Sequence, residues 1–186
     1  GTTAEPNLVP YSHRNLLAVT ERLQTWFELT AQDRCLNVAP VYYSHALTTT
    51  VLPPLLTGGS IGFPANAMNV DISEWFGDLR PTWYSAGPTL HLSVLEKFEQ
   101  QPAARTKHSL RFISSAGARL APDVHERLQN LLGVPVLEHY GSSETAQIAS
   151  NRLPPGPSKT RTRGIPWPQI VTIVGEDGRR LPPGEQ

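Results

Sequence analysis

Short apolar runs alternate along the chain with longer stretches whose apolar residues have helical spacing. The pattern predicts strands at residues 34–39, 60–63, 82–85, 110–114 and 134–137. It predicts helices at residues 13–29, 44–57, 72–79, 88–101 and 122–132. Because strands that alternate with helices build a sheet covered by helices, we expect an α/β fold: a layered sheet with flanking helices.

Residues that start and stop helices support these boundaries. Ser12 is a suitable N-cap for the first helix, and Pro88 falls in the first turn of the fourth. Gly133 follows the last helix and is a typical C-terminal stop. Pro53 and Pro54 are expected to interrupt or bend the second helix, because proline removes a backbone hydrogen bond.

The last part of the chain has a different pattern. Residues 151–166 are rich in proline, glycine and charge and are expected to form a loop. Residues 169–174 and 179–181 flank a Glu-Asp-Gly turn and predict a hairpin. We therefore divide the chain into residues 1–150, a partial α/β subdomain, and residues 151–186, the start of a β-rich subdomain.

Composition and charge exclude several classes of protein. Lys+Arg and Asp+Glu are equal at 16 each. The chain therefore lacks the basic excess that would indicate binding to nucleic acid. No apolar stretch approaches the roughly 20 residues that span a bilayer, and no signal peptide is visible. The single cysteine, Cys35, excludes an internal disulfide and favours a reducing, cytoplasmic location. The chain does not begin with Met, so we interpret it as a fragment of a longer protein.

One segment combines glycine, hydroxyls and a carboxylate directly behind a predicted strand. It comprises residues 140–145, with the sequence YGSSET. A glycine at the end of a strand lets backbone N–H groups approach a ligand. The ring of Tyr140 can stack on a flat base, and the following hydroxyls and carboxylate suit phosphate oxygens and Mg²⁺. The segment therefore predicts a nucleotide site.

Four segments in this order resemble the adenylate-forming (AMP-binding) superfamily. They are GTTAEP at 1–6, PVYYSHAL at 40–47, SAGARL at 115–120 and YGSSET at 140–145. That family includes acyl-CoA synthetases, the adenylation domains of peptide synthetases and firefly luciferase. The resemblance runs from Gly1 to Gln186 and implies part of the family's large N-terminal domain.

The resemblance implies an ATP site. Thr2 and Thr3 would donate hydroxyls to the β- and γ-phosphates, although the neutral Asn7 stands where the family usually has lysine. Ser143 and Glu144 would be the catalytic pair, with Ser143 bonding the α-phosphate and Glu144 binding Mg²⁺. The full set implied to bind the nucleotide comprises Thr2, Thr3, Gly117, Ala118, Arg119, Glu138, His139, Tyr140, Gly141, Ser142 and Ser143.

The resemblance also implies a pocket for a carboxylic acid. Tyr43 takes the position of a family histidine, and His45 follows two residues later. Ser85 and Gly87 would form another wall. A packed core histidine is the alternative interpretation of His45.

The expected activity is that of an AMP-forming acid:CoA ligase with ATP and Mg²⁺, and with CoA as the acceptor. We expect the isolated fragment to be inactive, because it ends before the family's ribose-binding aspartate, hinge and C-terminal domain with its catalytic lysine. Two alternatives stay open: a non-catalytic nucleotide-binding module that keeps the fold, and a peptide-synthetase domain. No Asp or Glu occurs between Asp33 and Asp71, which disfavours an α-amino acid because its buried ammonium would lack a counter-charge.

Overall fold

The computed structural model describes residues 8–105, 107–159, 162–168, 170–182 and 184–185. The predicted phosphate-loop residues Thr2, Thr3 and Asn7 lie outside the described residues. The described helices are α1 (His13–Phe27), the π-helical η1 (Ala46–Val51), α2 (Leu52–Leu56), the π-helical η2 (Ser73–Asp78), α3 (Pro88–Gln100), the 3₁₀ turn η3 (Pro102–Ala104) and α4 (Pro122–Leu132). The described strands are β1 (Arg34–Leu36), β2 (Ser60–Gly62), β3 (Trp83–Ala86), β4 (Phe112–Ser115), β5 (Val136–Ser142), β6 (Ala146–Ser150) and β7 (Ile165–Pro166).

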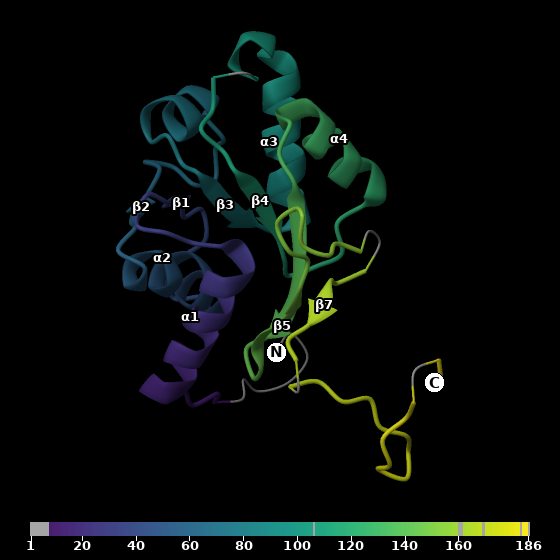
Figure 1. The fold of residues 1–186 in the computed structure, drawn as a ribbon. Coiled ribbons are helices and arrows are strands. Elements are labelled where there is room, and N and C mark those ends of the chain that lie inside the picture. The colour runs from purple at the N-terminus through teal and green to yellow at the C-terminus, as the bar shows by residue number, and fades with distance from the viewer. Residues whose placement is uncertain (1–7, 106, 160–161, 169, 183, 186) are drawn as a thin grey trace.

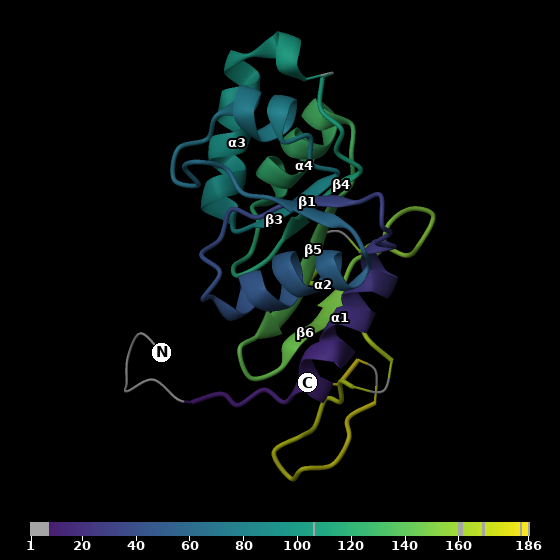
Figure 2. The ribbon, with the colours of Figure 1, turned by 90° about the vertical axis from the view of Figure 1, so that its left-hand side faces the viewer.

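The strands form one sheet with the order β2-β1-β3-β4-β5-β6-β7. The first five strands of this order are parallel, whereas β6 and β7 are antiparallel to their neighbours. Helices cover both faces: α1 and α2 lie on one side of the sheet, and α3 and α4 lie on the other (Figures 1 and 2). The expected α/β fold is confirmed.

Each face of the sheet has its own hydrophobic layer. On the α3/α4 face, Tyr84, Ile113 and Val136 pack against Phe98 and Leu128 of the helices. On the α1 face, the cluster is rich in aromatic rings: Trp26, Phe27, Trp83 and Phe112 are all buried. Successive residues of a strand point to opposite faces, so the two layers take alternate strand residues.

Two helix boundaries have the predicted chemistry. The Ser12 side chain accepts a hydrogen bond from the Asn15 amide, and the Asn15 side chain accepts one from the Ser12 amide, which completes a capping box. Gly133 ends α4 with a left-handed backbone at φ 66°, a conformation that glycine adopts without steric cost.

The predicted helix 44–57 is divided into a π-helical part and an α-helical part, which meet between Val51 and Leu52. The hydroxyls of Thr48 and Thr50 bond the carbonyls of Ser44 and Ala46, four residues earlier, which loosens the helix into the π-helical η1. The α-helix α2 then begins at Leu52, with prolines in its first turn.

The segment after YGSSET differs from the expectation. Residues 146–150 were not predicted as a strand, yet they form β6, which pairs with β5 as a hairpin. The β7 strand then pairs with β6 and extends the same sheet. Within the described residues, the predicted C-terminal hairpin consists of an antiparallel bridge between Val174 and Arg180, flanked by backbone bonds from Leu181 to Ile173 and from Gly175 to Arg179.

A charged cluster closes the amino ends of the parallel strands. Asp33 precedes β1 and receives two hydrogen bonds from Arg111, Nε to Oδ1 at 2.8 Å and Nη2 to Oδ2 at 3.0 Å. The Thr82 hydroxyl and the Thr30 amide donate to the same carboxylate at 2.7 and 2.8 Å. Burial raises the pKa of Asp33, but the bonds from Arg111 and Thr82 outweigh it and hold the pKa below its ordinary value.

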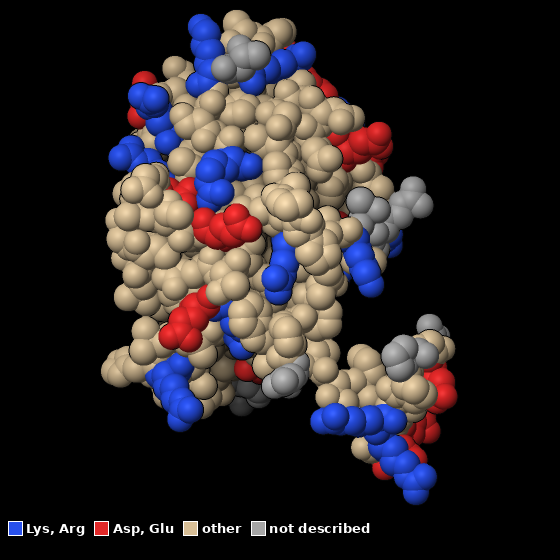
Figure 3. Space-filling model, in the orientation of Figure 1, with Lys and Arg blue, Asp and Glu red and all other residues tan. Residues whose placement is uncertain are grey.

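Charges on the surface are interspersed. On the face shown in Figure 3, Lys and Arg side chains alternate with Asp and Glu side chains, in keeping with the balanced composition. In the part of the chain that the structure describes, no helix combines the length and apolar character needed to cross a bilayer.

Candidate functional site

The carboxyl ends of the parallel strands form the edge of the sheet at which the sequence motifs meet. In open α/β sheets, ligands bind in the crevice at this edge. A cavity of about 150 Å³ lies here. Its lining combines η1 and the segment before it, the loop after β4 and the β5–β6 hairpin: Ser44, His45, Thr48, Ala116, Gly117, His139, Gly141, Ser142, Ser143 and Gln147.

Beneath the cavity, hydrogen bonds join two stacked histidines. His45 Nε2 lies 3.1 Å from Ser85 Oγ, which donates to Ser114 Oγ at 3.3 Å. Ser114 Oγ lies 2.9 Å from Nδ1 of His139. The two imidazole rings are nearly parallel, with centroids 5.6 Å apart and an interplanar angle of 11°. The structure therefore brings together His45, Ser85 and His139, which the sequence placed in two different subsites.

Both imidazoles are neutral at physiological pH. Burial lowers the pKa of His45 to about 4. Burial, followed by the neighbouring His45, lowers the pKa of His139 well below its usual range. The stacked pair therefore adds no positive charge to the cavity lining.

Gln147 is a cavity residue that sequence reasoning missed. Its side chain donates to Thr49 Oγ1 at 2.6 Å and to Thr48 Oγ1 at 3.3 Å, both on η1. Its Oε1 has no hydrogen-bond partner among the described residues. In the sequence, Gln147 is a polar residue two positions after the YGSSET motif. That position indicates a cavity residue only when β6 is known to pair with β5.

The YGSSET motif forms the end of β5 and the turn that leads into β6. A Cβ atom on Gly141 would lie 2.1 Å from the Ala146 carbonyl oxygen, so the hairpin itself requires glycine there. The Ser142 amide donates to Thr145 Oγ1 at 3.1 Å. Ser143 is exposed, and its Oγ lies 2.9 Å from Ser44 Oγ across the mouth of the cavity. The Tyr11 hydroxyl donates to the Ser143 carbonyl.

Glu144 and Tyr140 lie outside this cavity. Glu144 lines a second cavity of about 230 Å³ with Tyr11 and Arg22 of the N-terminal segment and α1. A hydrogen bond from the Ser142 side chain is the main cause that lowers the pKa of Glu144. Tyr140 is 51% exposed at the end of β5 and lines neither cavity. Its ring is thus accessible to a ligand.

Glu138 and the predicted adenine loop lie on the α4 side of the edge. The buried Glu138 carboxylate lies 3.7 Å from His125 Nδ1 and 3.5 Å from Arg163 Nη1. Arg163 also donates to the Ala118 carbonyl at 2.9 Å, which ties the later loop to the loop after β4. Gly117 has a left-handed backbone at φ 83° with no atom within 4 Å of its missing Cβ, and Arg119 is exposed.

Two predicted acid-pocket residues stand apart from the cavity. Tyr43 is 53% exposed, and its ring packs edge-on against Tyr42, with centroids 4.8 Å apart. Gly87 is exposed and forms the N-cap of α3. His45 lines the cavity, and the buried Ser85 supports it from below.

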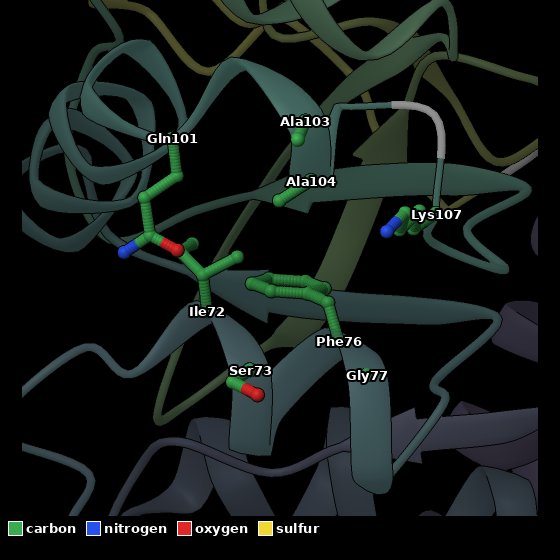
Figure 4. Close-up of a pocket in the computed structure, with 8 residues that line it drawn as sticks. All are labelled: Ile72, Ser73, Phe76, Gly77, Gln101, Ala103, Ala104 and Lys107. Carbon is green, nitrogen blue, oxygen red and sulfur yellow. The ribbon is translucent and has the colours of Figure 1, made fainter.

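Another cavity, of about 420 Å³, lies between η2 and the end of α3. Figure 4 shows the Phe76 ring inside it, with Gln101 and Lys107 at its margin. None of the three motifs that the structure describes contributes to its lining, so it is not the site that they predict. Among the described residues, no group of three His, Cys, Asp or Glu side chains could hold a metal ion.

Comparisons with known proteins agree with this geometry. Residues 1–186 match the family described as AMP-binding enzyme. The oxalate–CoA ligase of Arabidopsis thaliana is 33% identical over 191 residues, and the sulfoacetate–CoA ligase of Cupriavidus necator is 32% identical over 189 residues. Each alignment covers 100% of this chain, but only 37% and 36% of the respective relatives.

Solved structures show the same fold. ATP-bound MatB from Rhodopseudomonas palustris superposes with a TM-score of 0.82 at 28% identity, covering 100% of this chain and 36% of that protein. The chain thus spans about a third of the length of the relatives it matches. The motif order, the parallel sheet and the family match over every residue agree, and the chain belongs to the AMP-binding enzyme family.

Proposed function

We propose that the polypeptide carrying this chain is an ATP-dependent, AMP-forming acid:CoA ligase. The observation that carries the proposal is the cavity of about 150 Å³ at the carboxyl edge of the sheet. The PVYYSHAL, SAGARL and YGSSET segments line it together. The relatives named as oxalate–CoA and sulfoacetate–CoA ligases support CoA as the acceptor. The cavity lining contains no carboxylate among the described residues, which disfavours an α-amino acid substrate.

In the proposed reaction, the carboxylate of the acid attacks the α-phosphorus of ATP. The bond from that phosphorus to the bridging oxygen breaks, and pyrophosphate leaves with the electron pair. The resulting acyl-adenylate then transfers its acyl group to the thiol of CoA, and AMP leaves. No covalent enzyme nucleophile is needed, so positioning and electrostatic stabilisation supply the catalysis.

The described residues divide the nucleotide between two subsites in this proposal. The accessible Tyr140 ring stacks on adenine, beside the open backbone at Gly117. Ser143, at the mouth of the cavity, donates its hydroxyl to an α-phosphate oxygen. This places the α-phosphorus next to an acid held in the cavity.

Glu144 is the proposed ligand of Mg²⁺. A single exposed carboxylate fits this role, because Mg²⁺ is usually held by one or two carboxylates together with substrate phosphates. Its lowered pKa keeps the carboxylate ionised. Bound Mg²⁺ would neutralise charge on the phosphates, while Glu144 keeps the ion on the phosphate side of the hairpin turn.

The test is ATP–pyrophosphate exchange by the full-length polypeptide with fatty, aryl and short polar acids. Exchange that depends on one of these acids is expected. Glu144→Gln should lower it about 100-fold, the scale of losing one electrostatic contact to the transition state. The matched control is Glu126→Gln on the exposed surface of α4, which should leave exchange unchanged. Nucleotide binding without exchange for any acid would instead identify a non-catalytic binding module.

A second measurement concerns the chain by itself. We propose that the 186-residue chain alone forms no acyl-adenylate, because it spans about a third of its relatives. Purified chain incubated with ATP, Mg²⁺ and the acid accepted by the full-length polypeptide should release no pyrophosphate. Release above the rate without acid would contradict this.

A further inference from the structure

The side chain of Arg163 links three segments at the carboxyl edge of the sheet. Its Nη1 donates to the Ala118 carbonyl at 2.9 Å, in the loop between β4 and α4. The same nitrogen lies 3.5 Å from Oε2 of Glu138 on β5. Arg163 itself stands just before β7. One guanidinium therefore joins three parts of the chain that are distant in sequence.

The loop after β4 is anchored at both ends but exposed between them. Ala116 is buried, and its amide donates to the Ala86 carbonyl at 3.1 Å. Leu120 is buried at the other end. Residues 117–119 are exposed, and among the described residues the bond from Arg163 is the only hydrogen bond that joins them to another segment. Arg163 therefore restrains the middle of this loop.

Two features hold Arg163 in this position. The next residue, Gly164, packs so closely on the end of β6 that a Cβ atom on it would lie 2.1 Å from the backbone carbon of Ser150. Ile165 then pairs with Ser150 in the sheet. Glu138, which is only 4% exposed, supplies the opposite charge. Solvent and salt screen a partly buried ion pair less than an exposed one, so this carboxylate helps to keep the guanidinium at the loop.

The link lies on the same side of β5 as Tyr140. Glu138 and Tyr140 are two residues apart in one strand, and residues at this spacing face the same side of a sheet. The irregularity in the pairing with β6 comes after Tyr140, so it does not disturb this alternation. The intervening His139 faces the other side, where it stacks on His45. The loop that Arg163 restrains therefore borders the side on which the Tyr140 ring is exposed.

We infer that Arg163 is a positioning residue of the nucleotide site: it binds the Ala118 carbonyl while paired with Glu138 and so holds residues 117–119 ready beside the adenine of ATP. The inference rests on the proposed ligase function, in which adenine stacks on Tyr140. Ordering a flexible loop when a ligand binds costs conformational entropy, so a loop that is already restrained binds more tightly. Arg163 lies outside all four sequence motifs and acts without touching the nucleotide.

The test measures equilibrium dialysis of three radiolabelled probes against the full-length polypeptide: AMP, adenosine, and pyrophosphate with Mg²⁺. Arg163→Met removes both contacts of the guanidinium. The dissociation constants of AMP and of adenosine should both rise by about 10-fold, the scale of a hydrogen bond from a charged group. The constant of pyrophosphate, which has no base, should stay within about 2-fold, because separate sites respond independently.

Three further variants complete the set. Arg163→Lys should bring the AMP and adenosine constants back to within about 3-fold, because one nitrogen makes both contacts and an ammonium can replace it. Arg127→Met is the matched control, since Arg127 is a similarly exposed arginine that pairs with Glu99. It should leave all three constants unchanged. Arg163→Gln stays polar and should act like Arg163→Met, so it serves if the methionine lowers the stability of the fold.

Three other outcomes would overturn the inference. A rise for AMP with none for adenosine would show that Arg163 contacts a phosphate directly. An equal rise for all three probes would show that Arg163 only stabilises the fold. No change for any probe would show that the loop keeps its position without this side chain.

The positioning role and the ligase function can fail separately, because the binding measurement requires no turnover. AMP binding with the expected dependence on Arg163, but no pyrophosphate exchange with any acid, would overturn the ligase function and keep the positioning role. Normal exchange by Arg163→Met at limiting ATP would overturn the positioning role and leave the ligase function standing. A polypeptide that binds neither AMP nor ATP would overturn both.

Discussion

The two edges of the parallel sheet hold their buried polar groups in opposite ways. At the amino edge, the Asp33 carboxylate receives hydrogen bonds from Arg111, Thr82 and Thr30. At the carboxyl edge, His139 and Gln147 each keep one buried atom without a partner among the described residues. The Asp33 cluster is charged and satisfied, whereas the lining of the cavity at the carboxyl edge is uncharged and includes residues with unpaired buried atoms.

This difference separates a structural cluster from a binding site. A satisfied buried carboxylate rigidifies the strand ends but offers no atom to a ligand. An incomplete set of donors and acceptors makes the folded chain less stable until a ligand pairs with it. The motifs, more than the size of a cavity, therefore mark the site: the roomier cavity beside Phe76 is lined by none of the motif residues that the structure describes.

The largest effect is expected at the amino edge. Asp33→Ala should lower the free energy of unfolding by about 2–4 kcal/mol, because it removes several charge-assisted hydrogen bonds and leaves Arg111 without its partner. Urea denaturation followed by circular dichroism measures the loss. Glu99→Ala, which breaks the exposed ion pair with Arg127, is the control and should cost less than about 1 kcal/mol. Equal losses of unfolding free energy in the two variants would contradict the idea that the buried Asp33–Arg111 pair stabilises the fold more than the exposed Glu99–Arg127 pair.

The carboxyl edge should respond to mild acid, and the amino edge should not. The folded pKa of His45 is about 4, below an unfolded value of about 6.5, so protons bind the unfolded chain first as the pH falls. The unfolding free energy should therefore drop between pH 6.5 and pH 4, by up to about 2 kcal/mol at pH 5 from this group. The contribution of Asp33, whose pKa is lowered, is present above about pH 4 and is lost only as the pH falls further.

Urea midpoints at pH 7 and pH 5 measure this response. His45→Gln should shrink the difference between the two pH values relative to the unmodified chain. His91, buried behind Tyr84 and also with a pKa of about 4, should account for part of the remaining difference. An unchanged difference in His45→Gln would mean that the stacked pair is not buried in the folded state.

The smallest effect on stability is expected at the mouth of the cavity. Ser143 is exposed, and among the described residues its hydroxyl bonds one side chain, that of Ser44, while Tyr11 bonds its backbone carbonyl, which the substitution leaves in place. Ser143→Ala should change the unfolding free energy by no more than about 0.5 kcal/mol, as is usual for exposed substitutions. In pyrophosphate exchange, the same variant should lose about 10-fold or more, the value of a hydrogen bond to a charged group. A large loss of stability would instead make Ser143 a structural residue of the hairpin.

Local signals account for the parts of the fold that were predicted. The capping residue Ser12 and the stop at Gly133 act through contacts within a few residues, so sequence reasoning could locate α1 and α4. The parallel strands were visible as apolar runs because both of their faces are buried, as β3 and β4 show.

The remaining features depend on contacts between distant segments. β6 has the sequence AQIAS, with no β-branched alternation, and the turn before it lacks an Asn-Gly signal. Pairing with β5 on one side and β7 on the other makes it a strand. The place of Gln147 in the cavity lining was hidden for the same reason, because its partners Thr48 and Thr49 are about a hundred residues away in sequence.

Sequence motifs identified the edge of the sheet at which the site lies. They did not show which motif residues line the cavity and which lie outside it. His139 and Tyr140 are neighbours in one motif, yet alternate strand residues face opposite sides of the sheet. His139 therefore joins His45 beneath the cavity, while Tyr140 is exposed outside it. The roles of His139 and Tyr140 toward a nucleotide stay predictions.

The β5–β6 hairpin carries residues proposed to contact the nucleotide and residues that line the acid cavity, so the two are inherited together. One short stretch, residues 139–150, supplies the residue proposed for the phosphate in its turn and part of the cavity wall on the strands beside it. A homologous exchange of that stretch would transplant acid preference together with the nucleotide contacts. New substrate ranges could then arise in this family by recombination of a dozen codons, without any rearrangement of the surrounding sheet.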